Sequence, residues 1–160
     1  MKRKGSWKTY VFWVVLTEAV GALSGFLTRD GMKIYKETIV KPPLSPPSWV
    51  FPVVWIILYA LMGIAMARIR LSRKSPAQER GSLLYLLQLA FNFCWSIYFF
   101  NLQAFGFAFI WLVVMWGLIL WMLLTFRKVD LIAARLIIPY LLWVTFAGYL
   151  NFGVWLLNGR

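Results

Sequence analysis

The sequence lacks histidine altogether and contains a single cysteine, Cys94. One cysteine cannot form an intrachain disulfide, and a zinc site of Cys and His ligands cannot be built. The absence of histidine also removes the usual axial ligand of haem iron and the commonest general base. Tyrosine, cysteine and methionine can also ligate haem iron, but we do not expect a tightly held haem, a metal site or a cofactor. The sequence contains no hydrolytic triad or phosphate-binding loop.

Acidic residues are also scarce: five Asp and Glu stand against seventeen Lys and Arg, which gives a net charge of +12. The basic residues occur in short clusters between long apolar runs. Nucleic-acid binding requires a basic stripe on an exposed face, so we do not expect it. Clusters beside apolar runs indicate membrane topology and contacts with anionic lipid headgroups.

Hydrophobic residues make up 62% of the chain, whereas soluble domains average about 45–50%. Since a membrane span needs about 20 mostly apolar residues, we expect an all-α integral membrane bundle in one domain, residues 1–160. The first run contains Glu18 and is too long for a signal-peptide core, so it predicts a retained helix. The five expected spans are Trp7–Leu27, Trp49–Ala67, Leu83–Leu102, Phe105–Phe126 and Leu131–Leu157.

Five spans place the two termini on opposite sides of the membrane. The side of the N-terminus carries twelve basic residues and the other side five. The positive-inside rule therefore predicts a multi-pass protein, most simply of the cell membrane, with a cytoplasmic N-terminus.

Only the first connection is long, from Thr28 to Ser48. It ends in a run of four prolines between Pro42 and Pro47 that stiffens the chain and forbids a helix. It is either a lid or a plain connector. The turn near Gln103 is short, which predicts that the third and fourth helices are an antiparallel pair.

Polar residues in the third span follow helical spacing. Gln88, Asn92, Trp95 and Phe99 are separated by four, three and four residues, so they share one face. Two amides beside two rings suggest a pocket wall, and interhelical hydrogen bonding is the structural alternative. Similar stripes occur in the fifth span, with Pro139, Trp143, Ala147 and Asn151, and in the second, with Phe51, Trp55 and Tyr59.

Three other features of the spans have two interpretations each. Glu18 is either a proton or cation site, or a carboxyl group neutralised by burial or paired with a basic or amide group. Gly21 and Gly25 permit close helix approach, within the bundle or in a dimer. The tryptophans near the span ends are interpreted as interface belt residues: Trp7, Trp13, Trp49 and Trp155.

Three ordered motifs resemble the family of tryptophan-rich sensory proteins and translocator proteins (peripheral-type benzodiazepine receptor-like). They are KPPLSPPSWVFPVVWIILYALMG, QLAFNFCWSIYFF and AARLIIPYLLWVTFAGYLN. The resemblance implies a pocket between the helices for protoporphyrin-like tetrapyrroles, with porphyrin as a ligand rather than a cofactor, and it implies a homodimer. The expected ligand-binding residues are Tyr35, Phe51, Trp55, Asn92, Trp95, Trp143, Ala147 and Leu150. Family members usually have tryptophan where Ile34 and Leu44 stand, and the cholesterol motif at the end of the fifth helix is absent.

Three functions follow from this resemblance. We expect a membrane receptor or sensor that binds porphyrins or similar small hydrophobic molecules. A transporter of tetrapyrroles is the first alternative, although transporters often show inverted repeats and this chain shows none. A porphyrin-degrading enzyme that depends on light and oxygen is the second, but no acid–base set is present, so we expect no catalytic residues.

Overall fold

The computed structural model describes residues 6–160, and five long helices dominate this part of the chain. Each is long and apolar enough to cross a membrane, which confirms the expected all-α class. The charges at Lys2, Arg3 and Lys4 lie outside the described residues. The helices are α1 (Ser6–Thr38), α2 (Val50–Leu71), α3 (Pro76–Ser96), α4 (Phe105–Val129) and α5 (Leu131–Asn158).

Helix α1 is longer than its apolar run predicts. It continues to Thr38, so the expected loop from Thr28 to Ser48 is wrong at its first boundary, and the connection covers only 39–49. Charged residues such as Arg29 and Lys33 lower the hydropathy of this stretch, but they do not disfavour a helix. Gly31 brings the extension close to the π-helical turn η1 (Ile97–Asn101), since a Cβ there would lie 2.5 Å from the carbonyl oxygen of Phe100.

Side-chain caps mark where α3 and α5 begin. The Ser75 side chain caps α3 by accepting a 3.1 Å hydrogen bond from the backbone N–H of Gln78. Asp130 caps α5 in the same way, through the N–H of Ala133 at 2.9 Å. A π-helical turn, η1 (Ile97–Asn101), follows α3, and residues 102–104 then reverse the chain into α4. The expected antiparallel pair of α3 and α4 is therefore confirmed.

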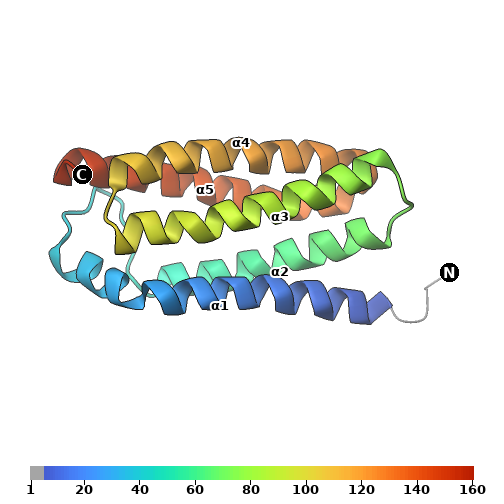
Figure 1. Ribbon diagram of the computed structural model, residues 1–160, viewed down its shortest axis with the longest axis horizontal. Coiled ribbons are helices and arrows are strands. Elements are labelled where there is room, and N and C mark those ends of the chain that lie inside the picture. The colour runs from blue at the N-terminus through green and yellow to red at the C-terminus, as the bar shows by residue number, and fades with distance from the viewer. Residues whose placement is uncertain (1–5) are drawn as a thin grey trace.

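The start of α1 and the end of α5 lie at opposite ends of the bundle (Figure 1). Its main helix contacts join α1 with α2, α3 with α4, α4 with α5, and α2 with α5. We call the end that holds 39–49 and η1 the first-loop end. The opposite end, which holds the start of α1 and the 72–75 connection, is the N-terminal end.

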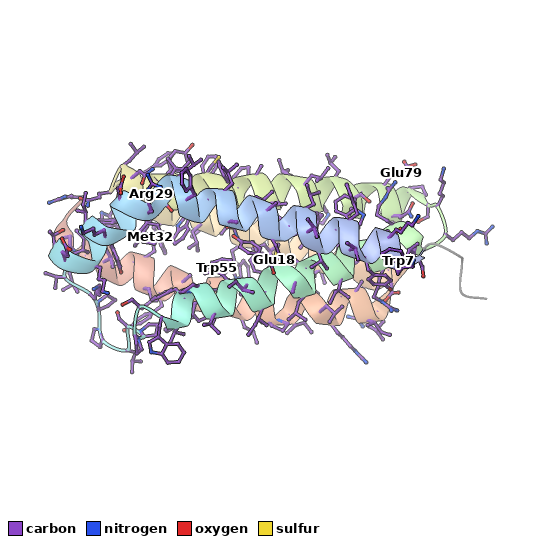
Figure 2. The ribbon with its side chains drawn as sticks, turned by 90° about the horizontal axis from the view of Figure 1, so that it is seen from below. Trp7, Glu18, Arg29, Met32, Trp55 and Glu79 are labelled. Carbon is purple, nitrogen blue, oxygen red and sulfur yellow. The ribbon has the colours of Figure 1, made fainter. Side chains whose placement is uncertain are left out.

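Large apolar side chains cover the outside of the bundle as well as its inside (Figure 2). Every helix exposes some of them, for example Phe26, Ile56, Leu83, Ile110 and Leu142. A surface of this kind is stable against lipid chains and unstable in water. The chain is therefore an integral, multi-pass membrane protein.

The tryptophans near the span ends fall into two groups. Trp7 and Trp49 are 63% and 68% exposed, as belt residues should be. Trp13 and Trp155 are partly buried against the core, and Trp13 meets the Tyr85 ring edge-on at 5.8 Å between centroids. The belt interpretation of Trp13 and Trp155 is therefore wrong, because their rings turn inward.

Candidate functional site

An aromatic cluster joins α2 to α5 in the half of the bundle nearer the first-loop end. The Phe51 ring of α2 packs edge-on against Trp143 of α5, with centroids 5.9 Å apart. Trp55 packs in the same way against Tyr140, at 6.2 Å, and also against Tyr59 at 5.3 Å. The rings of the two helices therefore interleave, and the aromatic stripes expected on α2 and α5 meet.

A second group of rings comes from α1, α3 and η1. Trp95 stacks on Phe99 with centroids 5.0 Å apart and an interplanar angle of 22°. Tyr35, at the extended end of α1, packs on Phe99 at 5.3 Å. The Trp95 Nε1 group donates a 3.0 Å hydrogen bond to Asn151 Oδ1, which ties α3 to α5.

A chain of buried polar groups lies deeper in the bundle. Tyr59 Oη donates to Asn92 Oδ1 at 3.1 Å, and Asn92 Nδ2 donates to Tyr140 Oη at 2.8 Å. Tyr140 Oη in turn donates to Gln88 Oε1 at 2.7 Å. The interhelical hydrogen bonding considered for Gln88 and Asn92 is therefore confirmed, and the Asn92 amide is already occupied by two protein partners.

The indole N–H of Trp143 is exceptional in this setting. Among residues 6–160, Trp143 Nε1 is the only buried side-chain nitrogen or oxygen without a hydrogen-bond partner. The indoles of Trp95, Trp111 and Trp116 all find an acceptor. An unpaired buried donor costs about 1–3 kcal/mol, so an acceptor beside this N–H would be stabilising.

The expected site residues lie on α1, α2, α3 and α5, and aromatic or hydrogen-bond contacts link all of them except Ala147 and Leu150 to the rings described above. Trp95, Asn92 and Leu150 are buried, and the others are partly buried: Tyr35, Phe51, Trp55, Trp143 and Ala147. The spacing argument misses Tyr140, which bonds to the side-chain amides of Gln88 and Asn92. Its signal was a tyrosine three residues before Trp143, hence on the same side of α5.

Glu18, the acidic residue of the first expected span, lies close enough to Tyr59 to interact with it electrostatically. Glu18 is partly buried on the side of α1 that faces α2 (Figure 2). No basic or amide side chain of residues 6–160 pairs with it, so the expected partner is absent from the described chain. The interpretations as a proton site or as a neutralised group remain predictions.

At the N-terminal end, an ion pair joins α2 to the start of α5. Arg68 of α2 donates to both carboxylate oxygens of Asp130, from Nε at 3.2 Å and from Nη2 at 2.8 Å. Burial raises the pKa of Asp130, but the Arg68 hydrogen bond, the Ala133 N–H and the Arg68 charge together outweigh it. The net pKa of this carboxyl group therefore lies below its ordinary value.

The fold and this region define a five-helix integral membrane protein with an aromatic cluster between α2, α3 and α5. Residues 13–156 match the TspO/MBR family, so the chain belongs to that family. It is 37% identical to the tryptophan-rich protein TspO of Chlorobaculum tepidum, over 94% of this chain and 96% of that protein. It is 33% identical to the tryptophan-rich sensory protein of Cereibacter sphaeroides, over 95% and 92% of the two chains. The translocator protein of Bos taurus is also 33% identical, over 93% and 89%.

Proposed function

We propose that this protein, in a membrane sensor or translocator role, binds a protoporphyrin-like tetrapyrrole or a similar small hydrophobic ligand in the aromatic cluster. The observation that carries the proposal is the buried Trp143 N–H without an acceptor. A ligand nitrogen or carboxylate oxygen would satisfy this donor. Membership of the TspO/MBR family and the names of its relatives support the sensor or translocator role.

The rings of the cluster suit a flat ligand. Phe51 and Trp55 present their rings to α5, and Trp143 presents its indole to α2. A flat ligand that enters between the helices stacks on these rings, and each such pair contributes about 0.5–1.5 kcal/mol beyond area burial, which offsets the loss of the edge-on pairs. Asn92 contributes by holding Tyr59 and Tyr140 in place. The other proposed contacts are Tyr35, Trp95, Ala147 and Leu150.

Access is proposed from the first-loop end. The 39–49 connection is fastened to α5 by the Tyr149 hydroxyl, which donates to the Pro43 carbonyl at 2.8 Å. Asn158 adds two hydrogen bonds to the backbone of Val40, at 3.1 Å and 2.9 Å. These three hydrogen bonds are exposed, but Ile39 is buried in the core and Pro42 packs on Gly153. We therefore propose that a lid movement is confined to residues 43–49.

The test measures protoporphyrin affinity by tryptophan quenching, corrected for the removed fluorophore. Trp143→Phe keeps a ring but removes the N–H, and we expect a loss of about two- to tenfold, the value of one hydrogen bond. Trp143→Ala also removes the stacking surface, and we expect a loss of about a hundredfold. Trp7→Phe, at a 63% exposed position, is the matched control and should bind like the wild type. Wild-type affinity in the folded Trp143→Ala protein would exclude the site.

Transport of the same ligand is the second candidate, favoured by relatives whose name is translocator protein. Uptake of porphyrin into sealed vesicles that contain the protein, and none into empty vesicles, would establish it. Loss of porphyrin absorbance that requires both light and the purified protein would instead identify a degrading enzyme. Binding without either effect is the result expected for a sensor.

A further inference from the structure

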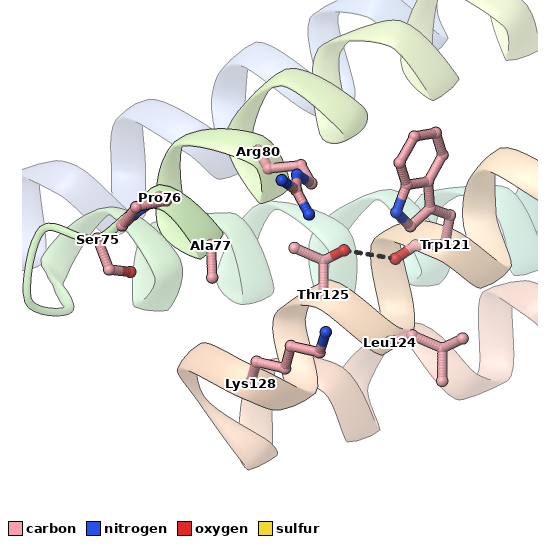
Figure 3. A pocket seen from close by; sticks show the side chains of 8 residues that line it. All are labelled: Ser75, Pro76, Ala77, Arg80, Trp121, Leu124, Thr125 and Lys128. Carbon is pink, nitrogen blue, oxygen red and sulfur yellow. Dashed lines mark hydrogen bonds between the residues drawn. The ribbon is translucent and has the colours of Figure 1, made fainter.

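A second candidate site lies at the N-terminal end, far from the aromatic cluster. There the first turn of α3 and the last turns of α4 enclose an open cavity of about 490 Å³ (Figure 3). This volume falls in the range of about 300–1,000 Å³ that is usual for small-molecule sites. Its lining includes Ala77, Arg80, Trp121, Leu124, Thr125 and Lys128.

Two cations point into this cavity from different helices. Figure 3 shows the guanidinium group of Arg80 and the ammonium group of Lys128 directed toward the space around Thr125. Neither forms an ion pair within residues 6–160, where the bridges join Arg29 to Asp30 and Arg68 to Asp130.

None of the chain's five acidic residues lines the cavity, and Glu79, which precedes Arg80 in the first turn of α3, forms no ion pair with it. The N-terminus of α3 adds a partial positive charge beside Ala77. Two like charges that converge without a counter-charge repel each other, so an anion between them would be stabilised.

The opposite wall of the cavity is apolar and faces lipid. Trp121 and Leu124 are 54% and 47% exposed on the outside of α4. Since α4 ends at Val129 with Arg127 and Lys128 in its last turn, this wall lies where the span meets the headgroup region. A free anion would use the cations but not the apolar wall.

We propose that this cavity binds an anionic phospholipid. Its phosphate group lies between Arg80 and Lys128, near the Thr125 hydroxyl oxygen, and an acyl chain follows Trp121 and Leu124 down the outside of α4. The Thr125 hydroxyl donates its own hydrogen to the carbonyl of Trp121 at 2.8 Å, so it meets the lipid as an acceptor for a headgroup hydroxyl. The chemistry is that of basic pockets between membrane helices that hold acidic headgroups.

The test counts lipids bound to the purified full-length protein by native mass spectrometry, with phosphatidylglycerol and phosphatidylcholine as probes. We expect the wild type to retain phosphatidylglycerol in preference to phosphatidylcholine. Arg80→Gln and Lys128→Gln should each weaken phosphatidylglycerol binding about fivefold, and the double variant more. Both side chains are exposed, so the variants should fold.

The matched control removes the same charge from the same end of the bundle. Arg73→Gln with Arg127→Gln changes two exposed residues outside the cavity and should leave phosphatidylglycerol binding unchanged. An equal loss in this control would mean that only net charge matters, and it would overturn the proposal. Trp121→Ala should weaken phosphatidylglycerol binding without changing the net charge of the protein. Competition by inorganic phosphate as effective as by phosphatidylglycerol would show an ion site only, and it would also overturn the proposal.

Discussion

Asn92 Nδ2 donates a 2.8 Å hydrogen bond to Tyr140 Oη, and this bond joins α3 to α5. The same tyrosine donates to Gln88, so one hydroxyl group satisfies two buried amides. These two hydrogen bonds fix the Tyr140 ring, which packs edge-on against Trp55. The polar core therefore positions the aromatic cluster in which we propose the ligand binds.

Removal of that hydroxyl should be costly. Tyr140→Phe leaves an amide donor of Asn92 and an acceptor of Gln88 unpaired in an apolar core, and we expect a loss of about 1–3 kcal/mol of unfolding free energy. Tyr98→Phe is the control, since no hydrogen bond of the described residues uses the Tyr98 hydroxyl. Unfolding in mild detergent measures both. Equal stability of the Tyr140→Phe and Tyr98→Phe variants would contradict the role of the network.

The two glycines of α1 should respond differently to the same change. A Cβ at Gly21 would overlap the Tyr59 ring, whereas a Cβ at Gly25 would meet nothing within 4 Å. Gly21→Ala should therefore destabilise the contact of α1 with α2. Gly25→Ala should be neutral or stabilise by about 0.5–1 kcal/mol, because alanine favours the helix. Thermal unfolding in detergent compares the two, and a larger loss for Gly25→Ala would refute the assignment.

The open surface at Gly25 also bears on the expected homodimer, which remains a prediction. If α1 pairs with a second copy through Gly25, Gly25→Leu should shift the dimer toward monomer in light scattering at high protein-to-detergent ratio. An unchanged dimer would place the interface elsewhere, and a monomeric wild type would contradict the dimer itself.

The Arg68–Asp130 pair predicts a dependence of stability on pH. The pKa of Asp130 is lowered in the folded protein, so the pair stabilises the fold above the unfolded pKa of about 3.9. This contribution is lost as the pH falls through the folded pKa. Asp130→Asn keeps an oxygen for the helix cap but removes the charge. It should lower the free energy of unfolding by about 1–2 kcal/mol at pH 7 and reduce the loss of stability between pH 7 and pH 3.

The control for this change is Asp30→Asn. The Asp30 side chain is 90% exposed and its contact with Arg29 is 3.8 Å long, so its removal should not alter stability. Unfolding between pH 3 and 7 measures both variants. If the stability of Asp130→Asn fell between pH 7 and pH 3 as much as that of the wild type, the ion pair would not contribute to the pH dependence of stability.

Membrane orientation can be tested with single cysteines in a Cys94→Ser background. The charge asymmetry predicts that Lys41→Cys, at the first-loop end, reacts with an impermeant thiol reagent in whole cells. Lys74→Cys, in the connection at the N-terminal end, should react only after permeabilisation. The reverse pattern would place the N-terminus outside.

Several features could be predicted from the sequence because they depend on short stretches of chain. Apolar runs of sufficient length determine the five spans, and the short segment around Gln103 determines the antiparallel pairing of α3 and α4. The proline run from Pro42 determines that no helix continues there. The end of α1 was misplaced because hydropathy reports the edge of the apolar run, while the helix itself ends only near that proline run.

Other features depend on how the helices rotate against each other, which no local pattern encodes. Helical spacing put Asn92 on the same face as Trp95, but only the packed bundle decided that Tyr59 and Tyr140 occupy its amide. The same spacing placed Trp143 on a stripe, and packing alone left its N–H without an acceptor. Arg80 and Lys128 are 48 residues apart in the chain, and their convergence on one cavity arises from the antiparallel contact of α3 with α4. The sequence by itself therefore determined which segments cross the membrane, and the tertiary structure decided which polar groups are paired and which, like the Trp143 N–H, have no partner within residues 6–160.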